Sequence, residues 1–189
     1  IIEHKQIKTF FQPIVSLKNA EVLGYEALSR VDRATLIKNV ESLFEAAKEC
    51  GRLGELELIC REKAFKAACN CKIADHNKKL FINISPEIIR DENFNKGFNQ
   101  EFLEQYNLGA SDIIFEITEK SVISDIKSFK VTIEHYKNHD YKIAIDDVGA
   151  GYSGLNLISE VAPNYLKLDI GLIHGVKKNN LKPQKSWKP

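Results

Sequence analysis

The chain has 189 residues, of which 43% are hydrophobic and 28% are charged, and its formal net charge is +1. This composition is typical of a folded globular domain that is long enough to bury a sizeable core. The nearly balanced charge gives no reason to expect DNA or RNA as a partner. No apolar run approaches the roughly 20 residues of a membrane span, so direct insertion into a membrane is not expected. The four cysteines form no CxxC pair, which favours reduced thiols in a cytoplasmic protein.

The hydrophobic pattern predicts strands and helices in alternation along the chain. Strands are expected at 9–17, 21–30, 79–84, 112–117, 141–145 and 164–169. Helices are expected at 36–47, 53–71, 94–106, 123–138 and 155–160. In the helix at 53–71, helical spacing directs six residues toward the core, namely Leu56, Ile59, Cys60, Ala64, Phe65 and Ala68. Pro13 places the first strand at a sheet edge or in irregular structure. The later alternation indicates a parallel sheet with helical crossovers, which is an α/β fold.

An acidic pair follows the apolar run Ile143–Ile145. Asp146 and Asp147 stand where that strand is expected to end, and a glycine-rich loop comes next. Two adjacent carboxylates repel each other unless a cation or protons offset their charge. Taken alone, such a pair is more often a surface turn than a functional site. The functional interpretation therefore depends on the residues at the other strand ends.

Polar side chains stand at or near the ends of several different predicted strands. They are Glu26, Asn83, Glu116, Asp146 and Asp147. The carboxyl ends of parallel strands form the edge at which α/β proteins bind ligands, and carboxylate and carboxamide oxygens are ligands that Mg²⁺ or Mn²⁺ prefers. Lys167 would add a positive charge near a phosphate or a metal-bound water. Arg30, on the same strand face as Glu26, is suited to pair with a phosphate. Each residue alone has a structural explanation, but their coincidence at successive strand ends favours a metal site.

Six short motifs follow one another along the chain. They are QPI at 12–14, GYEALSR at 24–30, NIS at 83–85, FEITE at 115–119, DDVGAGYSGL at 146–155 and KLD at 167–169. In this order they resemble the EAL domain of bacterial cyclic-di-GMP phosphodiesterases, and the resemblance covers roughly residues 10–173. It implies a TIM-type (β/α) barrel with an irregular or antiparallel first strand.

The resemblance also implies a role for each matching residue. The metal ligands would be Glu26, Asn83, Glu116 and Asp146, with Asp147 at a second metal or a metal-bound water. Lys167 would orient the attacking water, and Glu119 would brace the loop after Asp147. The dinucleotide would contact Arg30, Gln12 and Leu28. With Mg²⁺ or Mn²⁺ bound, and with Ca²⁺ inhibitory, the reaction would hydrolyse cyclic di-GMP to pGpG.

The match divides the chain into an EAL domain at 1–176 and a basic tail at 177–189, whose composition indicates disorder. In the family, strand-helix units after Lys167 carry a motif with the general-base Glu, and this chain has no such motif. We therefore expect the chain to be inactive or weakly active. A non-catalytic cyclic-di-GMP receptor and a protein-interaction module remain as alternatives. Exposed edges of an incomplete barrel favour a homodimer, and a longer parent protein could carry GGDEF or sensor domains.

Overall fold

The computed structural model describes residues 1–31, 37, 39–85, 100–118, 130, 133, 134, 136–149 and 154–171, with the backbone alone at 154–157. The strands are β1 (Ile7–Val15), β2 (Val22–Val31), β3 (Lys79–Asn83), β4 (Ile113–Thr118), β5 (Lys142–Val148) and β6 (Tyr165–Leu168). The helices are α1 (Val40–Glu49), α2 (Leu53–Asn70), α3 (Gln100–Glu104) and α6 (Gly154–Val161). Short 3₁₀ turns lie at Ala74–His76 and Ala110–Asp112. Among these elements, no helix has the length and hydropathy of a membrane span.

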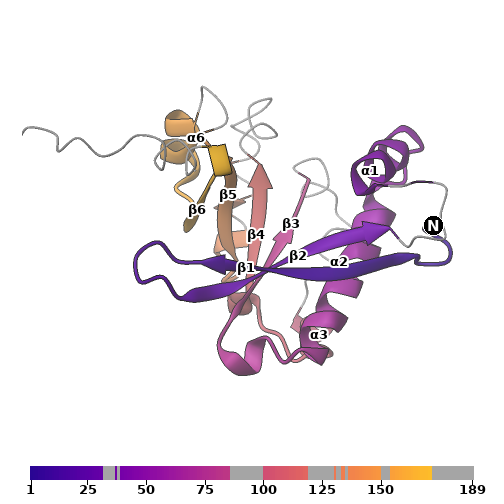
Figure 1. Cartoon of the computed structure of the whole chain (residues 1–189), viewed down its shortest axis with the longest axis horizontal. Helices are drawn as coiled ribbons and strands as arrows, with labels where there is room; N and C mark the ends of the chain where they lie inside the picture. Colours follow the sequence, from indigo (N-terminus) through magenta and orange to yellow (C-terminus); the bar gives the residue numbers. More distant parts are fainter. Residues whose placement is uncertain are drawn as a thin grey trace, which may run out of the picture.

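All six strands form one sheet in the order β1-β2-β3-β4-β5-β6. β1 pairs with β2 in antiparallel fashion, and every later neighbour pairs in parallel. Figure 1 shows β1 and β2 as a long hairpin that crosses the view, while β3 to β6 rise beside one another. The expected α/β fold and the antiparallel first strand are confirmed, and Pro13 lies on the terminal strand β1 as expected.

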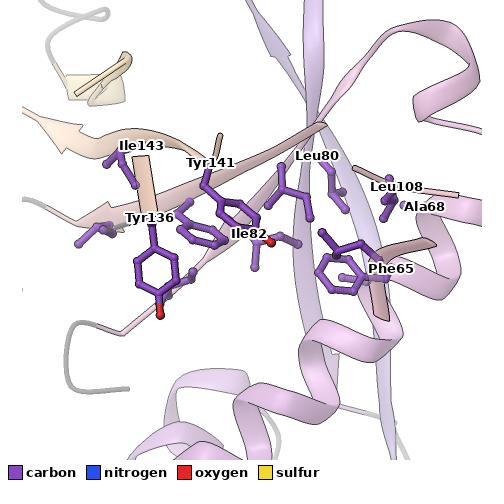
Figure 2. Packing of buried hydrophobic residues seen from close by; sticks show 14 of the residues in the cluster. Phe65, Ala68, Leu80, Ile82, Leu108, Tyr136, Tyr141 and Ile143 are labelled. Atoms are coloured by element: carbon purple, nitrogen blue, oxygen red, sulfur yellow. The ribbon is translucent and has the colours of Figure 1, made fainter. Parts of the chain in front are cut away.

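The two faces of the sheet have different chemistry because side chains alternate along each strand. One face packs against α2 and carries a large apolar core that includes Phe65, Leu80, Phe115 and Ile143. Figure 2 shows this packing, in which Tyr136 and Tyr141 lie beside the strand residues. The other face has a small apolar cluster of Phe81, Ile114 and Ala144. Toward the carboxyl ends of the strands, this face also carries the polar side chains that form the candidate site.

Among the described elements, two boundaries differ from the predicted ones by three residues or more. The helix expected from residue 36 begins at Val40, because the side chain of Asn39 accepts a hydrogen bond from the backbone N–H of Ser42 at 2.7 Å and so caps the helix there. The strand expected to end at Ile145 continues to Val148 as β5. A shift in the pairing of β5 with β6 between Ile145 and Val148, with a positive φ of 56° at Asp147, allows this continuation.

Some expectations fall wholly or partly outside the described residues. Of the helix expected at 94–106, only α3 and the residues after it are described, and the helix expected at 123–138 is described only in part. The tail at 177–189 and Glu119 also lie outside.

Candidate functional site

Three carboxylates converge at one point on the polar face of the sheet. Glu26 of β2, Glu116 of β4 and Asp146 of β5 each offer an oxygen, and these oxygens lie within 4.8 Å of one another. Glu26 and Glu116 are buried, and Asp146 is half-buried. The strand pairing explains the convergence, since β4 lies next to β5 and only β3 separates it from β2. This arrangement brings together three of the predicted metal ligands.

The ammonium group of Lys167 lies among these carboxylates. Its Nζ is 2.6 Å from Glu116 Oε1, 2.9 Å from Glu26 Oε2 and 3.1 Å from Asp146 Oδ2. Burial lowers the pKa of Lys167, but the charges of Glu116 and Glu26 and their hydrogen bonds outweigh burial and raise it overall. Lys167 therefore carries a positive charge that offsets part of the acidic charge of the cluster.

Asn83 joins the same group from the end of β3. Its Nδ2 donates a hydrogen bond to Glu26 Oε1 at 2.7 Å, and its backbone pairs in register with Glu116. Because neighbouring residues in a parallel pair point to the same side of the sheet, the side chains of Asn83 and Glu116 share the polar face. The carboxamide thus lies next to the three carboxylates, as the resemblance implied for a shared ligand set.

Glu116 is the most deeply buried member of the cluster. Burial, followed by the negative charge of Glu26, raises its pKa from 4.5 to about 8, although Lys167 acts in the opposite direction. Within the described part of the chain, Glu116 Oε2 accepts no hydrogen bond. A buried carboxylate oxygen without a donor is unusual in a folded protein, and a cation is one group that would satisfy it.

Asp147 is placed differently from its neighbour Asp146. It lies at the irregular position of β5, its side chain is exposed, and its backbone N–H donates to Asp146 Oδ1 at 2.9 Å. Partial burial raises the pKa of Asp147, and the charges of Asp146 and Asp169 raise it further. Asp147 therefore lies at the edge of the three-carboxylate cluster and is not one of its members. Asp169, which the sequence analysis left without a role, adds acidic charge on the same side.

A cavity of about 500 Å³ lies between the ends of β2 and β3 and the helices α1 and α2, and its described lining does not include Glu26, Asp146 or Lys167. Asn83 and Glu116 form part of its wall, and so do the predicted substrate contacts Leu28 and Arg30. The Arg30 side chain is exposed, and its Nη1 donates to the carbonyl of Ser29 at 2.8 Å. Gln12 is exposed on β1 in register with Glu26 and is not among the residues that line this cavity.

Sequence reasoning missed two charged residues in the cavity wall. Glu57 and Arg61 of α2 are buried and line the cavity, whereas the helical period had directed only apolar residues inward. A signal was present, because these charges are four positions apart and fall within the apolar stripe. The apolar predictions for α2 are otherwise confirmed, with Cys60 half-buried and the remaining five residues buried.

A mainly parallel α/β sheet with carboxylates gathered at one face defines an α/β protein with a candidate ligand site at the carboxyl ends of its strands. The chain matches the EAL domain family over residues 1–185. It belongs to that family.

Individual relatives agree with this assignment. The chain is 26% identical to the probable cyclic di-GMP phosphodiesterase PdeB of Escherichia coli, over 96% of this chain and 35% of that protein. It resembles the solved structure of a standalone EAL protein of Vibrio cholerae with c-di-GMP bound, at 32% identity and a TM-score of 0.74, over 90% of this chain and 69% of the other. It also resembles Klebsiella pneumoniae BlrP1 in a manganese and cyclic-di-GMP complex, at 26% identity and a TM-score of 0.76, over 90% of this chain and 42% of the other.

Proposed function

We propose that this chain binds cyclic di-GMP with a divalent metal and serves in its hydrolysis to pGpG. The observation that carries the proposal is the convergence of three carboxylates within 4.8 Å, next to a cavity of about 500 Å³. Relatives whose names include this substrate support it. Binding and turnover are tested separately, because we expect from the sequence that this chain is inactive or weakly active.

Glu26, Asn83, Glu116 and Asp146 are the proposed metal ligands. All four supply oxygen atoms, which suits Mg²⁺ or Mn²⁺, and the donorless Oε2 of Glu116 supports the fit. A bound cation of this kind lowers the pKa of a water and polarises a phosphate. Asp147, at the border of the cluster, is the proposed contact for a second metal or a metal-bound water. Ca²⁺ is expected to occupy the site and to inhibit.

Residues around the cluster have proposed roles toward the substrate. Lys167, among the carboxylates, is placed to hold a water or a phosphate oxygen beside them. Arg30 and Leu28 border the cavity, where a guanidinium can bind a phosphate in bidentate fashion. Gln12 is proposed as a further substrate contact, and Glu119 as the brace of the loop after Asp147.

We also propose a setting for the domain. The proposal is a homodimer in the bacterial cytoplasm, within a longer protein that carries GGDEF or sensor domains. The length of the relative PdeB supports a longer parent protein, since this chain spans 35% of it.

Calorimetric titration of cyclic di-GMP into the chain tests the main proposal, first with Ca²⁺ and then with Mn²⁺, followed by chromatography for pGpG. We expect metal-dependent binding in both cases and little pGpG. The variant Glu116→Gln should lose binding, while the control Glu160→Gln, on the exposed end of α6, should keep it. No metal-dependent binding by the natural chain would contradict the proposal, and binding with no pGpG at all would replace hydrolysis with a receptor role.

A further inference from the structure

Four charged side chains are buried in the described part of the chain, and two of them lie outside the acidic cluster. The two are Glu57 and Arg61, which are 6% and 4% exposed. Both belong to α2 and both line the cavity. Charged groups are rarely buried in this way without a compensating partner, so their position calls for a specific explanation.

Glu57 makes a defined contact with the segment that follows β3. Its Oε1 accepts a hydrogen bond from the backbone N–H of Ser85 at 3.2 Å. One residue earlier, the backbone N–H of Ile84 donates to the carbonyl of Glu116 at 3.0 Å. The chain just after Asn83 is therefore held on one side by β4 and on the other by α2.

This double attachment holds the chain immediately after Asn83. Asn83 is the last residue of β3, and its side chain reaches Glu26 at 2.7 Å. A strand end without attachments frays, because its backbone groups are free to bond with water. The contact from Glu57 to Ser85 thus limits the movement of a residue that the proposed metal site needs.

Arg61 lies one helical turn after Glu57 and faces the same cavity. Burial lowers the pKa of Arg61 to about 10, while the charge of Glu57 raises it, so the guanidinium stays positive at neutral pH. A nearby positive charge allows a carboxylate to remain ionised in a poorly hydrated wall. The opposite charges of Arg61 and Glu57 interact, so each offsets part of the cost of burying the other.

We infer that Glu57 is a positioning residue for the candidate site, and that Arg61 supplies the opposite charge that Glu57 requires. Glu57 acts through the Ser85 amide on Asn83 and has no direct contact with the proposed metal. The inference rests on the proposed function for its effect on ligand binding. Its effect on the end of β3 does not depend on that function.

A stabilising role alone does not account for this pair. Well-packed apolar residues often replace buried charges with no loss of stability, so a chain under selection for stability alone has little reason to retain them. Outer residues that orient metal ligands typically change metal affinity about 10-fold to 100-fold when they are altered. For Glu57→Asp, which keeps both charges, the expected effect thus falls on affinity and on local order more than on the melting temperature.

Two substitutions separate the length of the Glu57 side chain from its charge. Glu57→Asp keeps the charge but shortens the reach toward Ser85 by one methylene, and Glu57→Gln keeps the length and an acceptor oxygen but loses the charge. Glu62→Asp is the matched control, since Glu62 lies on the same helix and pairs instead with Lys5 at 2.7 Å. The measurements are amide-resolved hydrogen exchange at Ser85, with Phe115 as the core reference, and titration with Mn²⁺ and with cyclic di-GMP plus Ca²⁺.

For Glu57→Asp, we expect exchange at Ser85 to become about tenfold faster than in the natural chain, as loss of one charge-assisted hydrogen bond implies. Exchange at Phe115 should not change, and affinity for Mn²⁺ should fall about tenfold. Glu57→Gln should keep Ser85 protected and should bind more tightly than Glu57→Asp. Glu62→Asp should match the natural chain in every measurement.

If Glu57→Asp does not fold, the double variant Glu57→Leu with Arg61→Leu takes its place, because it removes both buried charges and leaves neither unpaired. It should fold, lose protection at Ser85 and bind Mn²⁺ less tightly. The inference would be overturned if the folded variant exchanged the Ser85 amide at the same rate as the natural chain. It would also be overturned if exchange at Ser85 became faster while the affinity for Mn²⁺ did not change. A natural chain that binds neither Mn²⁺ nor the dinucleotide would contradict the proposed function, while the Ser85 result would still decide whether Glu57 positions the end of β3.

Discussion

Lys167 is the residue on which the acidic cluster depends when no metal is bound. Its Nζ lies between 2.6 and 3.1 Å from Glu116, Glu26 and Asp146. Without this ammonium, the three acidic groups would lie together with no cation beside them in a site that is largely shielded from water. A divalent cation would compensate the same negative charge. The contacts of Lys167 and the binding of a metal are therefore linked, because both offset the charge of this cluster.

Replacement of Lys167 tests this link. Lys167→Met should lower the free energy of unfolding of the metal-free chain by about 3 kcal/mol at neutral pH, because buried carboxylates lose their cation. Mn²⁺ should restore more stability to the variant than to the natural chain, as thermal unfolding with Mn²⁺ and with EDTA would measure. Lys130→Met is the control, since Lys130 has a 3.4 Å ion pair with Glu160 at the surface and should change stability little. Equal stability of Lys167→Met and the control would refute the expectation.

The raised pKa of Glu116 predicts a pH dependence. The folded chain retains a proton on Glu116 up to about pH 8, whereas the ordinary value is 4.5. The unfolded chain releases that proton earlier, so this group makes the metal-free fold less stable as pH rises from about 4.5 to 8. Metal ligands must be deprotonated, so Mn²⁺ affinity should rise with pH up to about 8 and then level off.

Calorimetry in two buffers with different ionisation enthalpies measures the protons released when Mn²⁺ binds. Release close to one proton below pH 8, decreasing above it, is the expected result. Glu116→Gln removes the titrating group and serves as the comparison. If the number of protons released on Mn²⁺ binding were the same below and above pH 8, Glu116 would not be the group that titrates when Mn²⁺ binds.

At the scale of elements, the candidate site depends on the pairing of β2 with β3, because this pairing places Glu26 near Asn83. The two strands lie close together at Gly24, where an added Cβ would lie 2.1 Å from the carbonyl oxygen of Lys79. Glycine has no Cβ, so it permits the two backbones to lie this close together. The motif residue Gly24 is thus explained by packing, two positions before Glu26.

Gly24→Ala should therefore destabilise the fold by about 3 kcal/mol and shift Glu26 away from Asn83. Chemical denaturation would measure the stability, and Mn²⁺ titration would measure the site. Gly109→Ala is the matched control, because a Cβ at Gly109 would meet only Asp112 Oδ2 at 3.6 Å. The strand-pairing explanation fails if the two alanine variants are equally stable.

At the scale of the whole molecule, the described sheet has β1 and β6 as its terminal strands. The β6 end carries large apolar side chains that are exposed, namely Leu166, Leu168 and Ile170. Terminal strands with exposed apolar residues readily pair with another chain. A further strand or a second copy of this chain would fit this edge, and the proposed homodimer can be tested there.

Sedimentation over a range of concentrations should reveal a dimer of the natural chain. Leu166→Lys with Leu168→Lys should shift the equilibrium toward the monomer, because charges on a terminal strand oppose pairing. Leu17→Lys is the control, since Leu17 is 79% exposed in the turn between β1 and β2. A natural chain that stays monomeric throughout would rule out the dimer, and a loss of dimer in the control alone would place the contact at the hairpin.

The sequence alone determined the α/β class, the approximate place of each strand and the acidic residues of the site. Local patterns were sufficient for this, because alternation and helical spacing depend on near neighbours. The EAL-type motifs added the antiparallel first strand, which the structure confirms. Helix and strand ends were less accurate, since the cap at Asn39 and the irregular pairing at Asp147 depend on single hydrogen bonds and on a neighbouring strand.

Only the tertiary structure decided which of these residues meet. Lys167 contacts Glu26 across 141 positions of sequence, and no local pattern encodes that contact. The tertiary structure also separated Asp147 from the cluster and buried Glu57 and Arg61 beside the cavity. The physical reason is that strand order and register determine which side chains share a face and lie within hydrogen-bonding distance, and both result from long-range packing of the whole sheet.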